Sequence, residues 1–305
     1  MLQVRGNLRA NAHSEYFATN IREETMYELT VVIPTKNRLR FLQEAVASVP
    51  AGVEIIVVDD GSTDGTCETF KHIKNMGTGV SAARNTGVRA AQAPLVGFLD
   101  DDDVWLPGHV EAHLEAHSAN PLAVATYSQG RLASPALEAF GPPRPSIMPT
   151  NVGISGVLQQ VGRIVFKRSL FVPFDEGLSD GEDLDWVERM ALLGPFAPIP
   201  QVTILWRQHE RLTGGYAAWA KRYRQSGEVL GRSLRRSSDS RARFSRRVKR
   251  RGWAVHDAMT EAQACIKSGR KGDAARLLCR AWMVSPPHAA RQAPRFLRLA
   301  RQLAE

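Results

Sequence analysis

Three short apolar runs, each followed by a cluster of polar residues, constrain the fold of this chain more than any other feature. The runs cover residues 29–33, 53–58 and 94–99, and the clusters that follow them cover residues 35–38, 59–62 and 100–103. Runs of this length, rich in Val and Ile, indicate buried strands. Apolar residues recur at helical spacing between them, from Leu39 to Val49 and from Ser81 to about Ala91. Strands that alternate with helices predict an α/β domain with parallel strand pairs.

The polar clusters predict one site, because the carboxyl ends of strands in open α/β sheets form the ligand crevice. The alternative for the cluster at 59–62 is an ordinary turn, since Asp, Gly and Ser are turn residues. Four adjacent aspartates at 100–103 repel one another and need solvent, donors or a cation. Hard oxygen ligands suit Mg²⁺ or Mn²⁺. The alternative there is a solvated acidic turn that precedes the next helix.

Four segments in this order and spacing resemble glycosyltransferase family 2. They are Val31-Val-Ile-Pro-Thr-Lys-Asn37, Val57-Val-Asp-Asp-Gly-Ser-Thr-Asp-Gly-Thr66, Gly79-Val-Ser-Ala-Ala-Arg-Asn-Thr-Gly87 and Gly97-Phe-Leu-Asp-Asp-Asp-Asp103. The resemblance covers about residues 29–215 and is strongest up to Trp105. It implies a GT-A fold, an α/β domain around a mixed sheet that binds a nucleoside-diphosphate sugar and Mg²⁺ or Mn²⁺. It also implies transfer of the sugar with inversion at the anomeric carbon, and a UDP- or dTDP-type donor.

The resemblance also implies roles for single residues. Those on the nucleotide or donor side are Pro34, Thr35, Asn37, Asp60, Arg84, Asp100 and Asp101. Asp100 and Asp102 match a D-x-D motif, in which Asp102 would hold the metal. His209, in the segment Trp206-Arg-Gln-His209, would be a second metal ligand, and Arg207 or His209 would contact phosphate. The alternative for His209 is a loop histidine without a ligand role.

A second acidic cluster at 179–185 supplies the base that an inverting transfer needs to take the acceptor proton. It resembles the family's Glu-Asp motif before a helix, which makes Asp183 the catalytic base. Glu182 and Trp186 would bind the acceptor. The alternative is that these carboxylates merely begin a helix, where negative charge is favoured.

The charge of the chain is divided unequally. Residues 1–215 carry 18 basic and 25 acidic residues, whereas residues 216–305 carry 22 basic and 6 acidic residues, for a net charge of +9. We therefore predict a leader at 1–28 without regular structure, a catalytic GT-A domain at 29–215 and a basic all-α region at 216–305. Residues 128–162, which contain five prolines, are expected to be an irregular insertion that meets the acceptor. Two apolar helical patterns on either side of residues 268–272 predict a helical hairpin.

The basic region suggests a partner rather than chemistry. Ten Arg and Lys residues between Arg232 and Arg251 favour either solvated helices or an anionic membrane surface. Nucleic acid is not expected, because Phe244 is the single aromatic residue within the run. Three widely spaced cysteines and the lack of an 18-residue apolar run predict a cytoplasmic protein, peripheral at the inner membrane face.

Three histidines at helical spacing, His109, His113 and His117, are expected to form a solvent-facing stripe, with a zinc site as the alternative. Two rival functions remain. A sugar nucleotidyltransferase of related fold would open with a Gly-rich phosphate loop, whereas the first strand here ends in Pro34-Thr-Lys-Asn37. A non-catalytic nucleotide-sugar-binding module tethered by the basic region would not need the aspartates at 60, 102 and 183.

Overall fold

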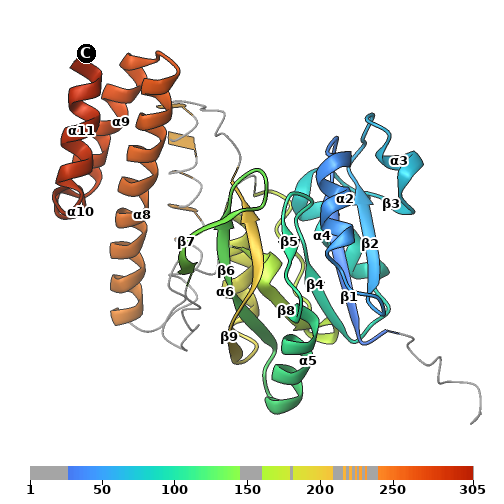
Figure 1. The fold of residues 1–305 in the computed structure, drawn as a ribbon. Coiled ribbons are helices and arrows are strands. Elements are labelled where there is room, and N and C mark those ends of the chain that lie inside the picture. Colours follow the sequence, from blue (N-terminus) through green and yellow to red (C-terminus); the bar gives the residue numbers. More distant parts are fainter. Residues whose placement is uncertain are drawn as a thin grey trace, which may run out of the picture.

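A computed structural model describes residues 27–144, 160–178, 181–208 and 240–304, together with separate residues between 216 and 231. The nine strands in the described residues form one mixed sheet (Figure 1). They are β1 (Leu29–Thr35), β2 (Glu54–Asp59), β3 (His72–Lys74), β4 (Leu95–Phe98), β5 (Val104–Trp105), β6 (Ala125–Ala133), β7 (Ala139–Arg144), β8 (Ile164–Lys167) and β9 (Phe196–Arg207). Their order is β3-β2-β1-β4-β8-β6-β9-β5, with β7 paired to β6.

The strands that precede the polar clusters lie side by side. β1 pairs in parallel with both β2 and β4, so the three carboxyl ends meet at one edge of the sheet. β8 then pairs antiparallel with β4 and β6, which makes the sheet mixed. The predicted fold class and the predicted meeting of the three clusters are therefore confirmed.

Helices cover both faces of this sheet. They are α2 (Leu39–Ala47), α3 (Thr66–Thr69), α4 (Gly79–Ala90), α5 (His109–Ala119) and α6 (Glu182–Met190), with 3₁₀ turns at Val161–Arg163 and Arg168–Leu170. Alternate residues of β1 point to opposite faces, as the pleat requires. Val32 packs in a core with α4 and α6, and Val31 packs in a second core with α2 and α5.

Helix α4 lies close against β1 because of a glycine. A Cβ atom at Gly87 would lie 2.2 Å from Cγ1 of Val32, so no larger residue fits without a shift. The glycine that ends the third motif thus allows α4 to bring its polar residues close to the strand ends.

Several predicted boundaries were wrong. The helix predicted from Ser81 begins two residues earlier, at Gly79, and a four-residue helix, α3, forms at Thr66–Thr69 where no helix was predicted above. The first part of the segment expected to be irregular forms the β6–β7 hairpin. Residues 145–159 of that segment, and the leader up to residue 26, lie outside the described residues.

The histidines of α5 also contradict the expectation of a solvent-facing stripe. His109, His113 and His117 are all buried, and His109 stacks on the Trp105 ring with centroids 4.0 Å apart. The His113 Nδ1 atom lies 2.6 Å from Thr126 Oγ1. Burial lowers the pKa of His109 to about 3 although a bond to Thr203 opposes it, so this histidine is a neutral core residue. No group of three or more His, Cys, Asp or Glu side chains that could hold a metal ion by themselves occurs in the part of the chain that the structure describes, which speaks against the zinc alternative.

The C-terminal part is helical, as predicted. It contains α8 (Ser240–Lys267), α9 (Lys271–Val284), α10 (Pro286–Arg291) and α11 (Ala293–Ala304). These helices lie side by side (Figure 1). They share a core of their own that includes Met259, Leu277 and Leu299. Gly269, with a φ of +75°, makes the turn between α8 and α9. The predicted helical hairpin is confirmed, whereas the domain limits at 28 and 215 stay predictions.

No helix within the described residues is both long and apolar enough to span a membrane.

Candidate functional site

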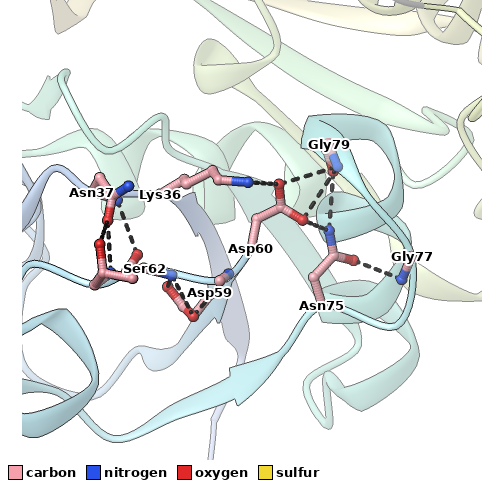
Figure 2. A network of polar contacts seen from close by, with 10 residues as sticks. Lys36, Asn37, Asp59, Asp60, Ser62, Asn75, Gly77 and Gly79 are labelled. Carbon is pink, nitrogen blue, oxygen red and sulfur yellow. Dashed lines mark hydrogen bonds and ion pairs between the residues drawn. The ribbon is translucent and has the colours of Figure 1, made fainter.

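Asp59, at the end of β2, stabilises its own turn. Its carboxylate accepts hydrogen bonds from the backbone N–H groups of Gly61 at 3.0 Å and Ser62 at 3.1 Å (Figure 2). Burial raises the pKa of Asp59, but the hydrogen bonds from Ser62 and Gly61 outweigh it and hold the pKa below its usual value. For this residue the ordinary-turn interpretation is the one that the geometry supports.

Asp60 points the other way, toward the start of α4 (Figure 2). Its Oδ1 accepts hydrogen bonds from Asn75 Nδ2 at 2.6 Å and from the Gly79 backbone N–H at 3.2 Å. Its Oδ2 lies 3.4 Å from Lys36 Nζ. The side chain is still 14% exposed. These hydrogen-bond donors, one of them at the N-terminus of a helix, stabilise the negative charge of the Asp60 carboxylate and fix its orientation. The carboxylate can therefore accept a hydrogen bond from a ligand without first having to reorient.

The loop after β1 carries the other residues expected on the nucleotide side. Asn37 adopts a positive φ of 55° and accepts a hydrogen bond from the Thr63 backbone N–H at 2.7 Å through Oδ1. Its own backbone N–H donates to Ser62 Oγ at 2.9 Å (Figure 2). Pro34 lies within β1 opposite Val58. Asn37 therefore ties the end of β1 to the turn after β2.

The four aspartates after β4 alternate in burial. Asp101 accepts hydrogen bonds from Thr35 Oγ1 at 2.8 Å and Arg38 Nη1 at 3.0 Å, and it is buried. Asp103 is buried too and accepts from the Arg207 backbone N–H at 3.0 Å. The side chains of Asp100 and Asp102 are 36% and 18% exposed. The two acidic positions of the D-x-D motif are thus the ones that remain accessible.

Asp101 is held inside the protein, because Thr35 and Arg38 bind its carboxylate, and its expected donor contact stays a prediction. Burial raises its pKa to about 6, although Arg38 and Thr35 oppose that rise. Burial likewise raises the pKa of Asp103, and the carboxylates of Asp100 and Asp102 add to the effect.

Arg84 joins the two acidic clusters. It projects from α4, and its Nη2 donates to Asp100 Oδ1 at 2.8 Å while its Nη1 donates to Asp183 Oδ1 at 2.7 Å. Glu182 lies 3.8 Å from the same Nη1. Asp100 follows β4 and Asp183 lies in the first turn of α6, so one guanidinium brings together the proposed sugar-side carboxylate and the proposed base.

Asp183 is an unusual carboxyl group. Burial raises its pKa to about 7, Arg84 opposes this rise, and Glu182 and Asp100 add to it. A carboxyl group that titrates near neutral pH is matched to general base catalysis.

Two expected contacts are corrected by the geometry. Trp186 is fully buried, where its indole stacks on Phe174 with centroids 5.0 Å apart and donates to the Val172 carbonyl at 2.8 Å. It is a core residue and not an acceptor contact. The buried Arg207 donates through Nε to the Asp102 carbonyl at 2.9 Å and pairs with Glu44, so it is engaged within the protein rather than presented to phosphate.

His209, the second expected metal ligand, lies outside the described residues, as do Ser179 and Asp180. Two residues at the site were not predicted from the sequence. Arg38 contacts Asp102 at 2.9 Å, and Asn75 orients Asp60. Arg38 belongs to the polar cluster after β1, so its position in the sequence could have identified it as a site residue. Asn75 follows the three-residue β3, which is too short to be recognised in the sequence, so no pattern could have identified it.

The carboxylates after β4 have the chemistry of a divalent cation site. Mg²⁺ is usually held by one or two carboxylates together with substrate phosphates and water. Asp102 offers such a carboxylate, with a side chain 18% exposed, although Arg38 binds its Oδ2 at 2.9 Å and would have to share it with the metal. The residues present therefore fit a metal that is shared with a diphosphate.

Part of the chain that carries these residues is similar to known proteins. Residues 30–131 match the sequence model of the family described as glycosyl transferase family 2. Validoxylamine A glucosyltransferase of Streptomyces hygroscopicus subsp. limoneus is 36% identical over 107 residues, which cover 30% of this chain and 24% of that protein. Succinoglycan biosynthesis protein ExoU of Rhizobium meliloti is 28% identical over 195 residues, 53% of this chain and 56% of that protein. The matches thus span between a quarter and somewhat over half of these relatives.

Solved structures share the fold. The S. aureus TarS 1–349 structure in complex with UDP-GlcNAc aligns with a TM-score of 0.57 at 15% identity, over 78% of this chain and 81% of that one. The mannosyltransferase PcManGT from Pyrobaculum calidifontis, in complex with GDP-Man and Mn²⁺, aligns with a TM-score of 0.54 at 18% identity, over 96% of this chain and 92% of that one. At these identities the likeness shows the fold.

Proposed function

We propose that this chain, whose residues 30–131 belong to glycosyl transferase family 2, transfers a sugar from a nucleoside diphosphate to a hydroxyl-bearing acceptor, with inversion and with a divalent metal. The observation that carries the proposal is the contact of Arg84 with both Asp100 and Asp183. It brings a D-x-D carboxylate next to the partly exposed carboxyl group of Asp183, whose pKa is raised to about 7, in the range that suits a general base.

In this mechanism Asp183 accepts the proton of the acceptor hydroxyl. The acceptor oxygen then forms a bond to the anomeric carbon while the bond from that carbon to the diphosphate oxygen breaks. The nucleoside diphosphate leaves with the electron pair of that bond, and the proton stays on Asp183. Glu182, beside the base at the start of α6, is the proposed acceptor contact.

Asp102 would hold the Mg²⁺ or Mn²⁺ ion, and His209 is proposed as its second ligand. When bound, the cation would stabilise negative charge on the diphosphate oxygens as the leaving group departs. The complex of PcManGT with Mn²⁺ supports this proposal by analogy of fold.

The donor is proposed to be a UDP- or dTDP-sugar, with Pro34, Thr35, Asn37 and Asp60 on the nucleoside side. Asp60 has an exposed carboxylate edge that would accept the N–H of a base imide. The fold itself does not choose the base, since TarS was solved with UDP-GlcNAc and PcManGT with GDP-Man. Neither the sugar nor the acceptor, be it glycan, lipid-linked, protein or small molecule, follows from the site.

The basic region is proposed to place the enzyme at an anionic membrane surface, as residues 232–251 suggested. The described helices α8 to α11 form a unit with its own core, consistent with an accessory role for residues 216–305. Sedimentation with vesicles tests this, and equal binding of the full chain to neutral and anionic vesicles would contradict it.

A thermal-shift panel tests the function itself. Nucleoside diphosphates and nucleotide sugars are added to the full chain with and without Mn²⁺, because a ligand that binds only the folded state raises its stability. We expect UDP or dTDP compounds to raise Tm in the presence of Mn²⁺, and Asp102→Ala to lose the metal dependence. A panel in which no nucleotide raises Tm would contradict the proposal.

A further inference from the structure

Arg84 is held almost entirely inside the protein. Its side chain is 3% exposed, and its guanidinium carbon lies 5.3 Å from the Phe174 ring centre and 5.9 Å from that of Phe98. The aromatic rings and the close packing of α4 on β1 fix the guanidinium plane. A side chain held in this way has little freedom to follow a mobile ligand.

Both terminal nitrogens of this guanidinium are already engaged by carboxylates. Nη1 binds Asp183 and Nη2 binds Asp100, at 2.7 Å and 2.8 Å. Of the five N–H donors of a guanidinium, the two that are bonded here point at carboxylates on two different elements, the end of β4 and the start of α6. The residue that the family resemblance assigns to the nucleotide is thus directed at the proposed base.

We propose that Arg84 is a positioning residue for Asp183, which aims the carboxylate at the acceptor and keeps it charged, rather than a nucleotide contact. The inference rests on the proposed function, because it takes Asp183 to be the base. Arg84 touches neither reacting atom in this account and acts through its bond to Asp183.

The charges around Asp183 give the reason. Three charged groups act on it: Arg84 from α4, Asp100 from the end of β4 and Glu182 from its own helix. Two of the three are negative, so Arg84 alone favours the ionised form. Without that cation, burial and the two neighbouring carboxylates would keep Asp183 protonated at neutral pH, and a protonated carboxyl group cannot accept the acceptor proton.

Three variants of the full chain separate the two roles. Arg84→Met removes the cation, and Arg84→Lys keeps a charge but loses the planar fork that holds two carboxylates at once. Arg189→Met is the matched control, because Arg189 also forms a short bond, 2.7 Å, to an aspartate of α6, namely Asp185. That pair lies outside the proposed site.

Three readouts are recorded for each variant. The first is the affinity for UDP with Mg²⁺, by calorimetry. The second is release of UDP from UDP-glucose and UDP-N-acetylglucosamine, with water as acceptor, between pH 5.5 and 9.5. The third is the ¹³C carboxyl titration of Asp183, assigned by its loss in Asp183→Asn, which needs no turnover.

For Arg84→Met we expect UDP affinity within about twofold of wild type and UDP release about 10²-fold lower at pH 7. The rise of activity with pH and the ¹³C titration should both move to higher pH, so that activity recovers toward pH 9. Arg84→Lys should lower UDP release while its titration stays near that of wild type. Arg189→Met should leave the titration of Asp183 unchanged.

The opposite pattern overturns the inference. It would consist of UDP affinity at least about tenfold weaker in Arg84→Met, a difference of about 1.4 kcal/mol, with the titration of Asp183 unmoved. If Arg84→Met does not fold, Arg84→Lys decides: unchanged UDP release with weaker UDP binding overturns the inference. A wild-type chain that binds neither UDP nor either sugar would instead overturn the proposed function, while the Asp183 titration still tests the pairing itself.

Discussion

Two groups of carboxylates at the same sheet edge are neutralised in different ways. The nucleotide side, Asp59 and Asp60, is held mainly by backbone N–H groups and the Asn75 amide, with Lys36 farther off. The transfer side, Asp100 to Asp103 with Asp183, is held by the guanidinium groups of Arg84 and Arg38, the Thr35 hydroxyl and the Arg207 backbone N–H.

The consequence is seen in the pKa values. Hydrogen bonds outweigh burial at Asp59 and hold its pKa below the usual value, whereas burial outweighs Arg84 at Asp183 and raises its pKa to about 7. Dipoles that satisfy a carboxylate make it a fixed acceptor, while burial among like charges prepares a carboxyl group to take a proton. In the proposed function this difference separates a side that binds the nucleotide, where Asp59 shapes the turn beside Asp60, from a side that transfers the proton.

The largest expected effect is on turnover at the transfer side. Asp183→Asn removes the base and should lower release of nucleoside diphosphate by about 10²- to 10⁴-fold, the usual contribution of a general base. Initial rates with saturating nucleotide sugar measure it. Asp185→Asn, the same substitution two residues further along α6, is the control, since that carboxylate binds Arg189 instead. Wild-type rates in Asp183→Asn would remove the residue from the role.

The next effect falls on the nucleotide side. Asp60→Asn keeps the shape of the side chain but loses the charge that Asn75 and Gly79 hold in place. Hydrogen bonds to charged groups contribute about 1.5–3 kcal/mol, so UDP should bind about 10- to 100-fold more weakly. Calorimetry measures the affinity, and an unchanged affinity would break the assignment of Asp60 to binding.

The pH dependence of turnover sharpens the same division. Asp183 acts as a base only when ionised, so activity should rise with pH through about 7 and then level off. The affinity for UDP, which depends on the nucleotide side, should change much less over the pH range in which activity rises. Rates and affinities measured between pH 5.5 and 8.5 test this, and an activity limb centred near pH 4 would contradict the buried base.

The smallest effect is expected at Asp59, which shapes its turn. Asp59→Asn weakens the bonds to Gly61 and Ser62 and should lower the free energy of unfolding by about 1–3 kcal/mol. Because the pKa of Asp59 is depressed in the folded state, this contribution is present above its unfolded pKa and is lost as pH falls through the folded one. Urea denaturation at pH 7 and pH 3 measures it, and an equal difference between Asp59→Asn and wild type at both pH values would oppose the account.

The sequence predicted well which strands end beside one another in the sheet. It predicted poorly which side chains contact one another at those strand ends. β1, β2 and β4 are buried apolar runs, so both their existence and the meeting of their ends could be predicted. β3 has three partly exposed residues and β5 has two residues, too short for any periodicity.

The β6–β7 hairpin was missed because it contains residues that usually interrupt strands. Gly130 sits in β6 where a Cβ would lie 2.3 Å from the Trp206 ring, and Pro142 and Pro143 lie in β7, which pairs only with β6 in the described residues. An edge strand tolerates proline, since one side of it forms no ladder.

Within the site, the positions of the motifs in the sequence could not predict which side chains point into the site and which point into the core. Trp186 stands next to the Glu-Asp motif and was expected to bind the acceptor, yet its ring packs in the core against Phe174. The bonds from Arg84 to Asp100 and Asp183 join three segments distant in the sequence, so they become visible only in the fold.

The most direct test of the division is the affinity of Asp183→Asn for UDP with Mg²⁺, measured by calorimetry beside wild type and Asp60→Asn. The account predicts that Asp183→Asn binds UDP within about twofold of wild type while Asp60→Asn binds at least about tenfold more weakly, a difference of about 1.4 kcal/mol. Loss of UDP affinity in Asp183→Asn as large as that in Asp60→Asn would show that the two sides are not separate, and would contradict the account.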